Sequence, residues 1–79
     1  MQKLFGDQLR EERKKQDLTA EMIAKACGIS RSYITLIESG KRQPGKRILP
    51  KIAVALHLNK SVVLDWYLVN IKLSLGEGI

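Results

Sequence analysis

A helix stop and a helix start stand two residues apart near the middle of this chain. Thr19 is a suitable helix N-cap, and the inward apolar residues that follow it are Ile23, Ala24 and Cys27. Gly28 ends this segment, because glycine readily adopts the left-handed conformation that closes a helix. Ser30 then supplies an N-cap for the next helix. Two helices joined by so tight a turn form a helix-turn-helix.

The remaining apolar residues also recur at helical spacing, and no strand-like alternation is sustained, so the predicted fold is all-α with five short helices. The first helix has one inward stripe, made of Phe5, Leu9 and Arg13. It is expected to end in the polar residues 14–17. In the third helix Ile34 and Ile37 face inward, and Gly40 is its predicted left-handed C-terminal cap.

The last two helices differ in how their apolar residues are distributed. The fourth has a single apolar face, made of Ile48, Leu49, Ile52, Ala53 and Leu56. Pro50 lies close to its first turn, where a missing backbone donor costs little but can bend the helix. The fifth covers residues 59–73 with Asn59 as its cap, and it is apolar on more than one face, which predicts a second subunit as cover. Its predicted dimer contacts are Val62, Trp66, Val69 and Ile71.

The length of 79 residues predicts one domain over residues 1–73, followed by a flexible tail over residues 74–79. A domain of this size buries only about 60% of the surface that its unfolded chain exposes, so its stability margin is thin. A partner subunit would add to that margin.

Positive charge is concentrated in one segment. The formal net charge is +6, and eleven acid-free residues contain Lys41, Arg42, Lys46, Arg47 and Lys51. Such a patch on a small domain suits the neutralisation of nucleic-acid phosphates, since each contact releases condensed counterions. A basic face that is merely solvated is the alternative explanation.

Other residue types are too sparse for an active site or a metal centre. The chain has one cysteine and one histidine, so it offers no internal disulfide, no usual zinc ligand set and no nucleophile with a base; we expect neither enzyme activity nor a cofactor. Cys27 is interpreted as a core hydrophobe, and His57 as a residue that suits the end of the fourth helix. With no signal peptide and no membrane-length apolar run, a cytoplasmic protein without a membrane partner is expected.

The stretch of residues 18–44 resembles the helix-turn-helix of the Cro and phage-repressor family, also called the XRE family. The resemblance extends over about residues 5–64, and its most specific parts are residues 28–34 and 37–41. It implies a lambda-repressor-like five-helix domain whose second and third helices form the motif. A bacterial, phage or plasmid-encoded regulator that binds double-stranded DNA is the function that it implies.

The resemblance also implies which residues meet the bases. These are the outward residues of the third helix: Arg31, Ser32, Thr35 and Leu36. A guanidinium fork such as that of Arg31 can bond O6 and N7 of guanine together. Leu36 departs from the usual polar choice and either contacts a thymine methyl or packs locally.

Phosphate contacts are expected from the residues that flank the motif: Thr19, Tyr33, Ser39, Lys41, Arg42, Lys46 and Arg47. Tyr33 reaches a phosphate or a base edge, or its ring is partly buried. Ala20 replaces a glutamine that many relatives have, so one phosphate contact is expected to be missing. Arg13 and Glu38 match positions that form a partly buried ion pair in some relatives, and they are interpreted as structural.

The functional prediction is a homodimeric repressor whose two recognition helices enter successive major grooves of a palindromic operator, about 34 Å apart. RNA polymerase and a protein antagonist are further candidate partners. Trp66 and Tyr67 are interpreted as core or dimer contacts. The alternative is an antitoxin-type module that neutralises a toxin through the fifth helix and autoregulates its operon.

Overall fold

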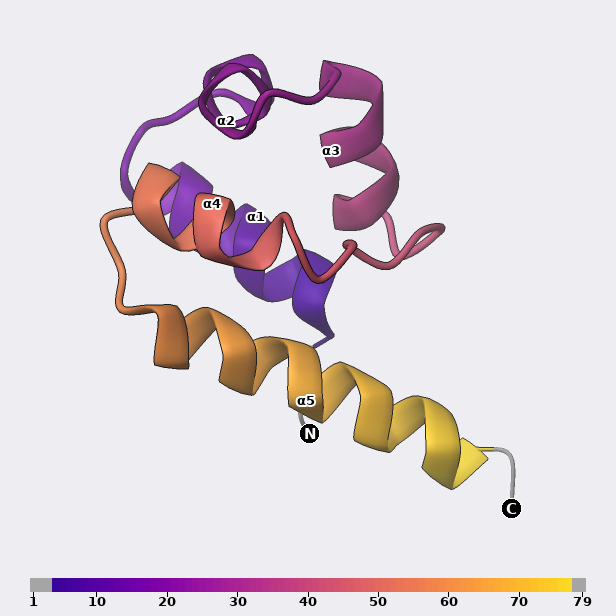
Figure 1. Cartoon of the computed structure of the whole chain (residues 1–79). Helices are drawn as coiled ribbons and strands as arrows, with labels where there is room; N and C mark the ends of the chain where they lie inside the picture. The colour runs from indigo at the N-terminus through magenta and orange to yellow at the C-terminus, as the bar shows by residue number, and fades with distance from the viewer. Residues whose placement is uncertain (1–3, 78–79) are drawn as a thin grey trace.

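The computed structural model describes residues 4–77, and their side chains as far as Val69. These residues contain no strand and form α1 (Phe5–Lys15), α2 (Ala20–Cys27), α3 (Arg31–Glu38), α4 (Leu49–Ala55) and α5 (Lys60–Glu77). Helices α1 and α4 lie in the middle of the molecule, with α2 and α3 on one side and α5 along the other (Figure 1). The last turns of α5, drawn in yellow, extend beyond the other helices. The all-α, five-helix prediction is confirmed.

Both N-caps of the central motif are formed as predicted. The Oγ1 atom of Thr19 accepts a hydrogen bond from the backbone N–H of Met22 at 3.1 Å. The Oγ atom of Ser30 accepts one from Tyr33 N–H at 3.1 Å. Each cap satisfies one of the backbone donors that a helix leaves free at its start, which explains why α2 and α3 begin where they do.

The first four helices all end in the same way, with one residue in the left-handed conformation. These residues are Asp17, Gly28, Gly40 and His57, with φ between 57° and 79°. After each, a backbone N–H bonds back to a carbonyl five residues earlier, as from Lys41 to Leu36 at 3.0 Å and from Leu58 to Ala53 at 2.9 Å. Gly28 and Gly40 were predicted at two of these helix ends. Asp17 and His57 adopt the same conformation although their Cβ atoms make it less favourable than for glycine.

The core is built from the apolar stripes that the sequence predicts. Its buried members are Phe5, Leu9, Ile23, Ala24, Cys27, Ile34, Ile37, Leu49, Ile52, Ala53, Leu56 and Val63. Cys27 is a core residue, and burial raises the pKa of its thiol above the ordinary value, an effect that the charge of Lys51 partly offsets. Pro50 lies in the first turn of α4, where its missing N–H leaves no helical bond unmade.

Helix α5 differs from its prediction in length. It begins at Lys60, after Asn59, and it continues to Glu77, so residues 74–77 are helical where a tail was expected. Residues 78–79 lie outside the described part of the chain. Among the α5 side chains that the structure describes, which end at Val69, only Val63 is fully buried. Trp66 packs edge-on against the ring of Phe5, with the ring centroids 6.0 Å apart. Trp66 therefore packs against the core of the domain.

Two further findings concern the described residues alone. Within residues 4–77, no helix combines the length and the apolar composition that crossing a membrane requires. Over the same range, no three His, Cys, Asp or Glu side chains lie close enough together to hold a metal ion.

Candidate nucleic-acid interface

Helix α3 has a buried face and an open face. Ile34 and Ile37 are buried in the core, which directs the other side of the helix outward. On that side, the four predicted base-contacting side chains line one shallow hollow: Arg31, Ser32, Thr35 and Leu36. All four are exposed, and Leu36 is an exposed large apolar residue that presents 39% of its surface. An apolar group in an otherwise polar hollow can contact a thymine methyl.

The hydroxyl of Thr35 is held by the helix itself. It donates a hydrogen bond to the carbonyl oxygen of Arg31 at 3.1 Å, which fixes the side-chain rotamer. The hydroxyl hydrogen is therefore occupied, while the oxygen still has lone pairs that can accept a bond from a base donor. Ser39 behaves similarly, since its hydroxyl donates to the Leu36 carbonyl at 3.1 Å.

An ion pair holds α3 against α1. Nε of Arg13 donates to Oε2 of Glu38 at 2.8 Å, and Nη2 donates to Oε1 at 2.9 Å. The third nitrogen, Nη1, donates to the carbonyl oxygen of Leu18 at 2.9 Å. The hydrogen bonds to the Glu38 carboxylate raise the pKa of Arg13 above its ordinary value, although burial opposes the effect. The pair suggested by the resemblance is thus present, and it also holds the α1–α2 turn.

Gly6 sets the distance between α1 and α3, a role that sequence reasoning missed. A Cβ atom at this position would lie 2.2 Å from the Ile37 carbonyl oxygen and 2.8 Å from that of Glu38. No side chain fits there, because both atoms belong to backbone. The available signal was a glycine inside a helical pattern, where it costs up to about 1 kcal/mol relative to alanine unless packing requires it.

The turn after α3 is rigid and basic. The Leu36 carbonyl accepts bonds from the N–H groups of Lys41 at 3.0 Å and Arg42 at 3.2 Å. The guanidinium of Arg42 lies over the ring of Tyr33, 4.7 Å from the centroid, and the Tyr33 hydroxyl accepts a bond from Gly45 N–H at 3.3 Å. Tyr33 is half-buried, which is one of the placements predicted for it, and its hydroxyl donates no hydrogen bond to the other described residues.

The other predicted phosphate contacts are all exposed. They are Thr19 at the start of α2, Ser39 and Lys41 after α3, and Lys46 and Arg47 before α4. The chain has no acidic residue between Glu38 and Asp65, and Glu38 is neutralised by Arg13. The surface after α3 is therefore cationic without internal compensation, which favours a polyanionic partner.

The predicted dimer residues do not lie together on one open face. Val62 is exposed and Val69 is half-buried, whereas Trp66 packs on Phe5; the side chain of Ile71 lies outside the described residues. The more exposed apolar side chains of α5 are Leu64 and Leu68.

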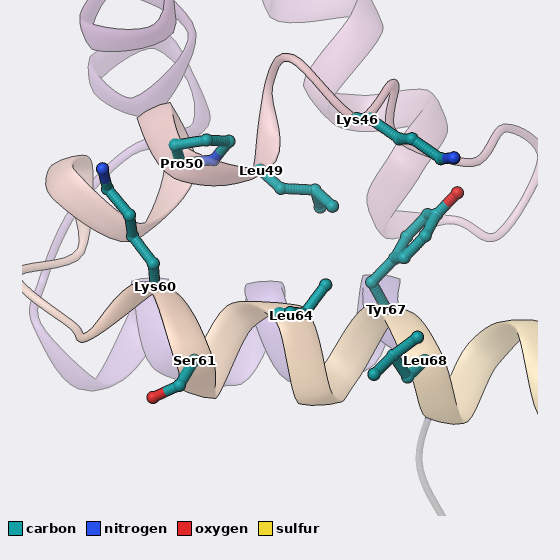
Figure 2. Close-up of a pocket in the computed structure, with 8 residues that line it drawn as sticks. All are labelled: Lys46, Leu49, Pro50, Lys60, Ser61, Leu64, Tyr67 and Leu68. Atoms are coloured by element: carbon teal, nitrogen blue, oxygen red, sulfur yellow. The ribbon is translucent and has the colours of Figure 1, made fainter.

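These two leucines border a groove of about 680 Å³ between α4 and α5. Figure 2 shows Leu49, Leu64 and Tyr67 facing into the groove, with Lys46 and Lys60 at its rim. Lys46 thus borders this groove and also belongs to the basic segment that follows α3.

Comparison with known proteins agrees with this arrangement. The profile of the helix-turn-helix family matches residues 9–62. An ImmF control region 10 kDa protein of Bacillus phage phi105 is 34% identical over 61 residues, which are 77% of this chain and 68% of that protein. The transcriptional regulator ClgR of Mycobacterium tuberculosis is 34% identical over 64 residues, but this chain spans only 57% of its length.

A solved structure supports the same relationship. The P22 c2 repressor in complex with a synthetic operator superposes with a TM-score of 0.74 at 25% identity, covering 82% of this chain and 98% of that one. Fold, family profile and relatives agree with each other. The chain belongs to the helix-turn-helix family of DNA-binding transcriptional regulators, the XRE family that its sequence resembles.

Proposed function

We propose that this protein is a homodimeric repressor that binds a palindromic operator and reads it with α3 in the major groove. The observation that carries the proposal is the outer face of α3, where four exposed side chains line one hollow: Arg31, Ser32, Thr35 and Leu36. A guanidinium fork, two hydroxyls and an apolar side chain are suited to the donors, acceptors and thymine methyls of base edges.

Elements on both sides of α3 support this orientation. The N-terminus of α2 has backbone N–H groups with no partner inside the helix, which suits a phosphate. The turn after α3 adds Lys41 and Arg42, held by bonds to the Leu36 carbonyl. If the base edges of a duplex contact α3, its sugar-phosphate backbone lies beside the N-terminus of α2 and the turn after α3. Affinity then comes from these two elements, and specificity comes from α3.

A second subunit is proposed to cover the groove beside Leu64 and Leu68. Leu68 exposes 51% of its surface, and Leu64 exposes 46%, which is unfavourable for large apolar side chains in water. A twofold dimer would give two copies of α3 and hence a palindromic site. None of the relatives described above is named as an antitoxin, so the comparisons give that alternative no support.

The test starts with selection of bound duplexes from a random-sequence pool, followed by fluorescence anisotropy with the enriched site and a scrambled one. We expect an inverted repeat whose half-sites are centred about one helical turn, or 34 Å, apart. Arg31→Ala is expected to lose discrimination at one base position, worth about 1–3 kcal/mol. Lys41→Ala removes the same charge from an exposed position after α3, and it should weaken binding to both duplexes equally.

Two outcomes would contradict the proposal. The pool yields no enriched sequence, or Arg31→Ala weakens binding to the enriched and scrambled duplexes by the same factor as Lys41→Ala. Either result would assign α3 a backbone contact without base recognition.

A further inference from the structure

The groove between α4 and α5 combines apolar walls with cationic ends. Its volume is about 680 Å³, and its walls include Leu49 from α4 and Leu64 and Leu68 from α5. Lys46 and Lys60 lie at its rim (Figure 2). Small-molecule sites are mostly apolar clefts of about 300–1,000 Å³ in which a few polar groups orient the ligand. The groove has the size and the composition of such a site.

Two donor groups converge at one end of the groove. Figure 2 shows the Lys46 ammonium and the Tyr67 hydroxyl pointing to the same end, with Lys60 at the other. None of these three side chains makes a hydrogen bond or an ion pair with another described residue. An ammonium and a phenol hydroxyl both donate, so one carboxylate can accept from both. This end of the groove therefore suits an anionic head group.

The positive charge of the groove has no counterpart in its own lining. The lining contains two lysines and no acidic residue. A second copy of the same face would bring two more lysines and no carboxylate from its lining. A twofold contact thus explains the apolar walls but does not explain the cationic ends, which favour a bound anion.

We infer that the groove binds an alkyl carboxylate, with its chain along the leucine walls and its carboxylate at Lys46 and Tyr67. The bound chain covers Leu64 and Leu68, which the proposed dimer needs, so the ligand releases the second subunit and lowers operator affinity. Only this release step rests on the proposed function. The groove is then the site at which a small molecule regulates the repressor.

The first experiment titrates the labelled protein with octanoate and follows its backbone amides by NMR. 1-Octanol and octylamine have the same alkyl chain with a neutral and a cationic head, and acetate has the head without the chain. Octanoate is expected to shift amides of α4 and the first half of α5, and to bind about tenfold more tightly than 1-octanol or octylamine. Each methylene added between hexanoate and octanoate should strengthen binding about fourfold.

Lys46→Gln is expected to weaken octanoate binding about tenfold and to remove the preference for octanoate over 1-octanol. Tyr67→Phe, which removes only the hydroxyl, should weaken it about threefold. Lys51→Gln is the matched control, because Lys51 is an exposed residue of α4 that does not line the groove. A purely structural role of Lys46 would leave the preference between the two head groups unchanged.

A second experiment tests release of the subunit by sedimentation equilibrium and by anisotropy with the enriched duplex. Saturating octanoate is expected to reduce the mass from dimer to monomer and to weaken operator binding at least about tenfold. Acetate at the same concentration controls for added salt and should change neither value.

The inference is overturned if 1-octanol binds as tightly as octanoate, if Lys46→Gln keeps the preference, or if bound octanoate leaves the dimer mass unchanged. A dimer whose amides do not respond to octanoate would have the second subunit as the sole occupant of the groove. Failure of the proposed function is separate: a wild type that is monomeric before any ligand is added contradicts the dimer and the release step, while the NMR titration still decides the ligand.

Discussion

The guanidinium of Arg13 and the carboxylate of Glu38 face each other through two hydrogen bonds of 2.8 and 2.9 Å, across 25 positions in the chain. Only 15% and 9% of these two side chains are exposed. Because Glu38 is the last residue of α3 and Arg13 lies in the last turn of α1, the pair holds the end of α3 to α1. Fixed geometry of this kind limits the angles at which α3 can meet DNA.

Removal of one partner is therefore expected to be costly. Glu38→Gln leaves the Arg13 guanidinium largely buried without a counter-charge, and we expect the free energy of unfolding in urea to fall by about 2–4 kcal/mol. The double variant Arg13→Met, Glu38→Leu removes both charges and should recover much of that loss. Additive losses in the double variant would mean that the two side chains act independently.

Gly6→Ala is expected to disturb the contact between α1 and α3. The added methyl would meet the backbone oxygens of Ile37 and Glu38, which cannot move without shifting α3. We expect a loss of about 1–3 kcal/mol in urea unfolding, despite the better helix propensity of alanine. Lys14→Ala, at an exposed position of the same helix, should stay within about 0.5 kcal/mol of the wild type. A stabilised Gly6→Ala protein would show that the helices separate freely.

His57→Gly is expected to stabilise the protein. His57 has a φ of 57° at the end of α4, a conformation that is unfavourable for a residue with a Cβ atom. The gain should be about 1 kcal/mol, seen as a rise in Tm of about 4–8 °C by circular dichroism. Gly28→Ala is the reverse control, because its φ is 69° and no atom lies within 4 Å of the added Cβ. An unchanged Tm in both variants would mean that the ends of α2 and α4 adjust to either residue type without strain.

Leu36 is expected to act on recognition and to have little effect on stability. Its side chain is 39% exposed, so Leu36→Ala should change the urea midpoint little. If it meets a thymine methyl, replacing that thymine by uracil should weaken wild-type binding and leave Leu36→Ala binding unchanged. Anisotropy with single-uracil duplexes makes this comparison. Equal effects of uracil on both proteins would assign Leu36 to local packing.

Leu68→Glu is expected to prevent the proposed dimer from forming, because the charge would have to be buried in its interface. Sedimentation equilibrium measures the mass, and the circular dichroism spectrum should be unchanged. Val54→Glu is the matched control, since Val54 on α4 is 68% exposed and does not line the groove beside Leu68. If Val69→Glu dissociates the protein and Leu68→Glu does not, the interface lies on the other side of α5.

Sequence reasoning succeeded where the residues that determine a feature lie within one helical turn of each other. The side-chain oxygens of Thr19 and Ser30 lie three residues before the N–H groups that they cap, and Gly28 and Gly40 close their own helices. The helix-turn-helix and most of the core followed from these signals and from helical periodicity. Asp17 and His57 were missed as helix ends of the same kind, because neither residue type by itself signals a positive φ.

The candidate site was accessible to sequence reasoning only in part. Family resemblance grouped Arg31, Thr35 and Leu36 on one face, and the structure brings them to one hollow. The resemblance did not point to the recess of about 370 Å³ that contains Arg10 and Arg31, because these residues are 21 positions apart and border one recess only when α1 packs on α3. Apolar content likewise predicted that α5 packs on something, but residues spread around a helix do not say which side meets Phe5.

The sequence alone thus determined that five helices form, the caps of α2 and α3, and the direction in which α2, α3 and α4 present their apolar stripes, since these depend on spacing within a few residues. Tertiary structure decided the close approach at Gly6, the packing of Trp66 on Phe5 and the recess that contains Arg10. Each of these joins atoms from different helices. Their distances depend on how whole helices pack, which no local pattern encodes.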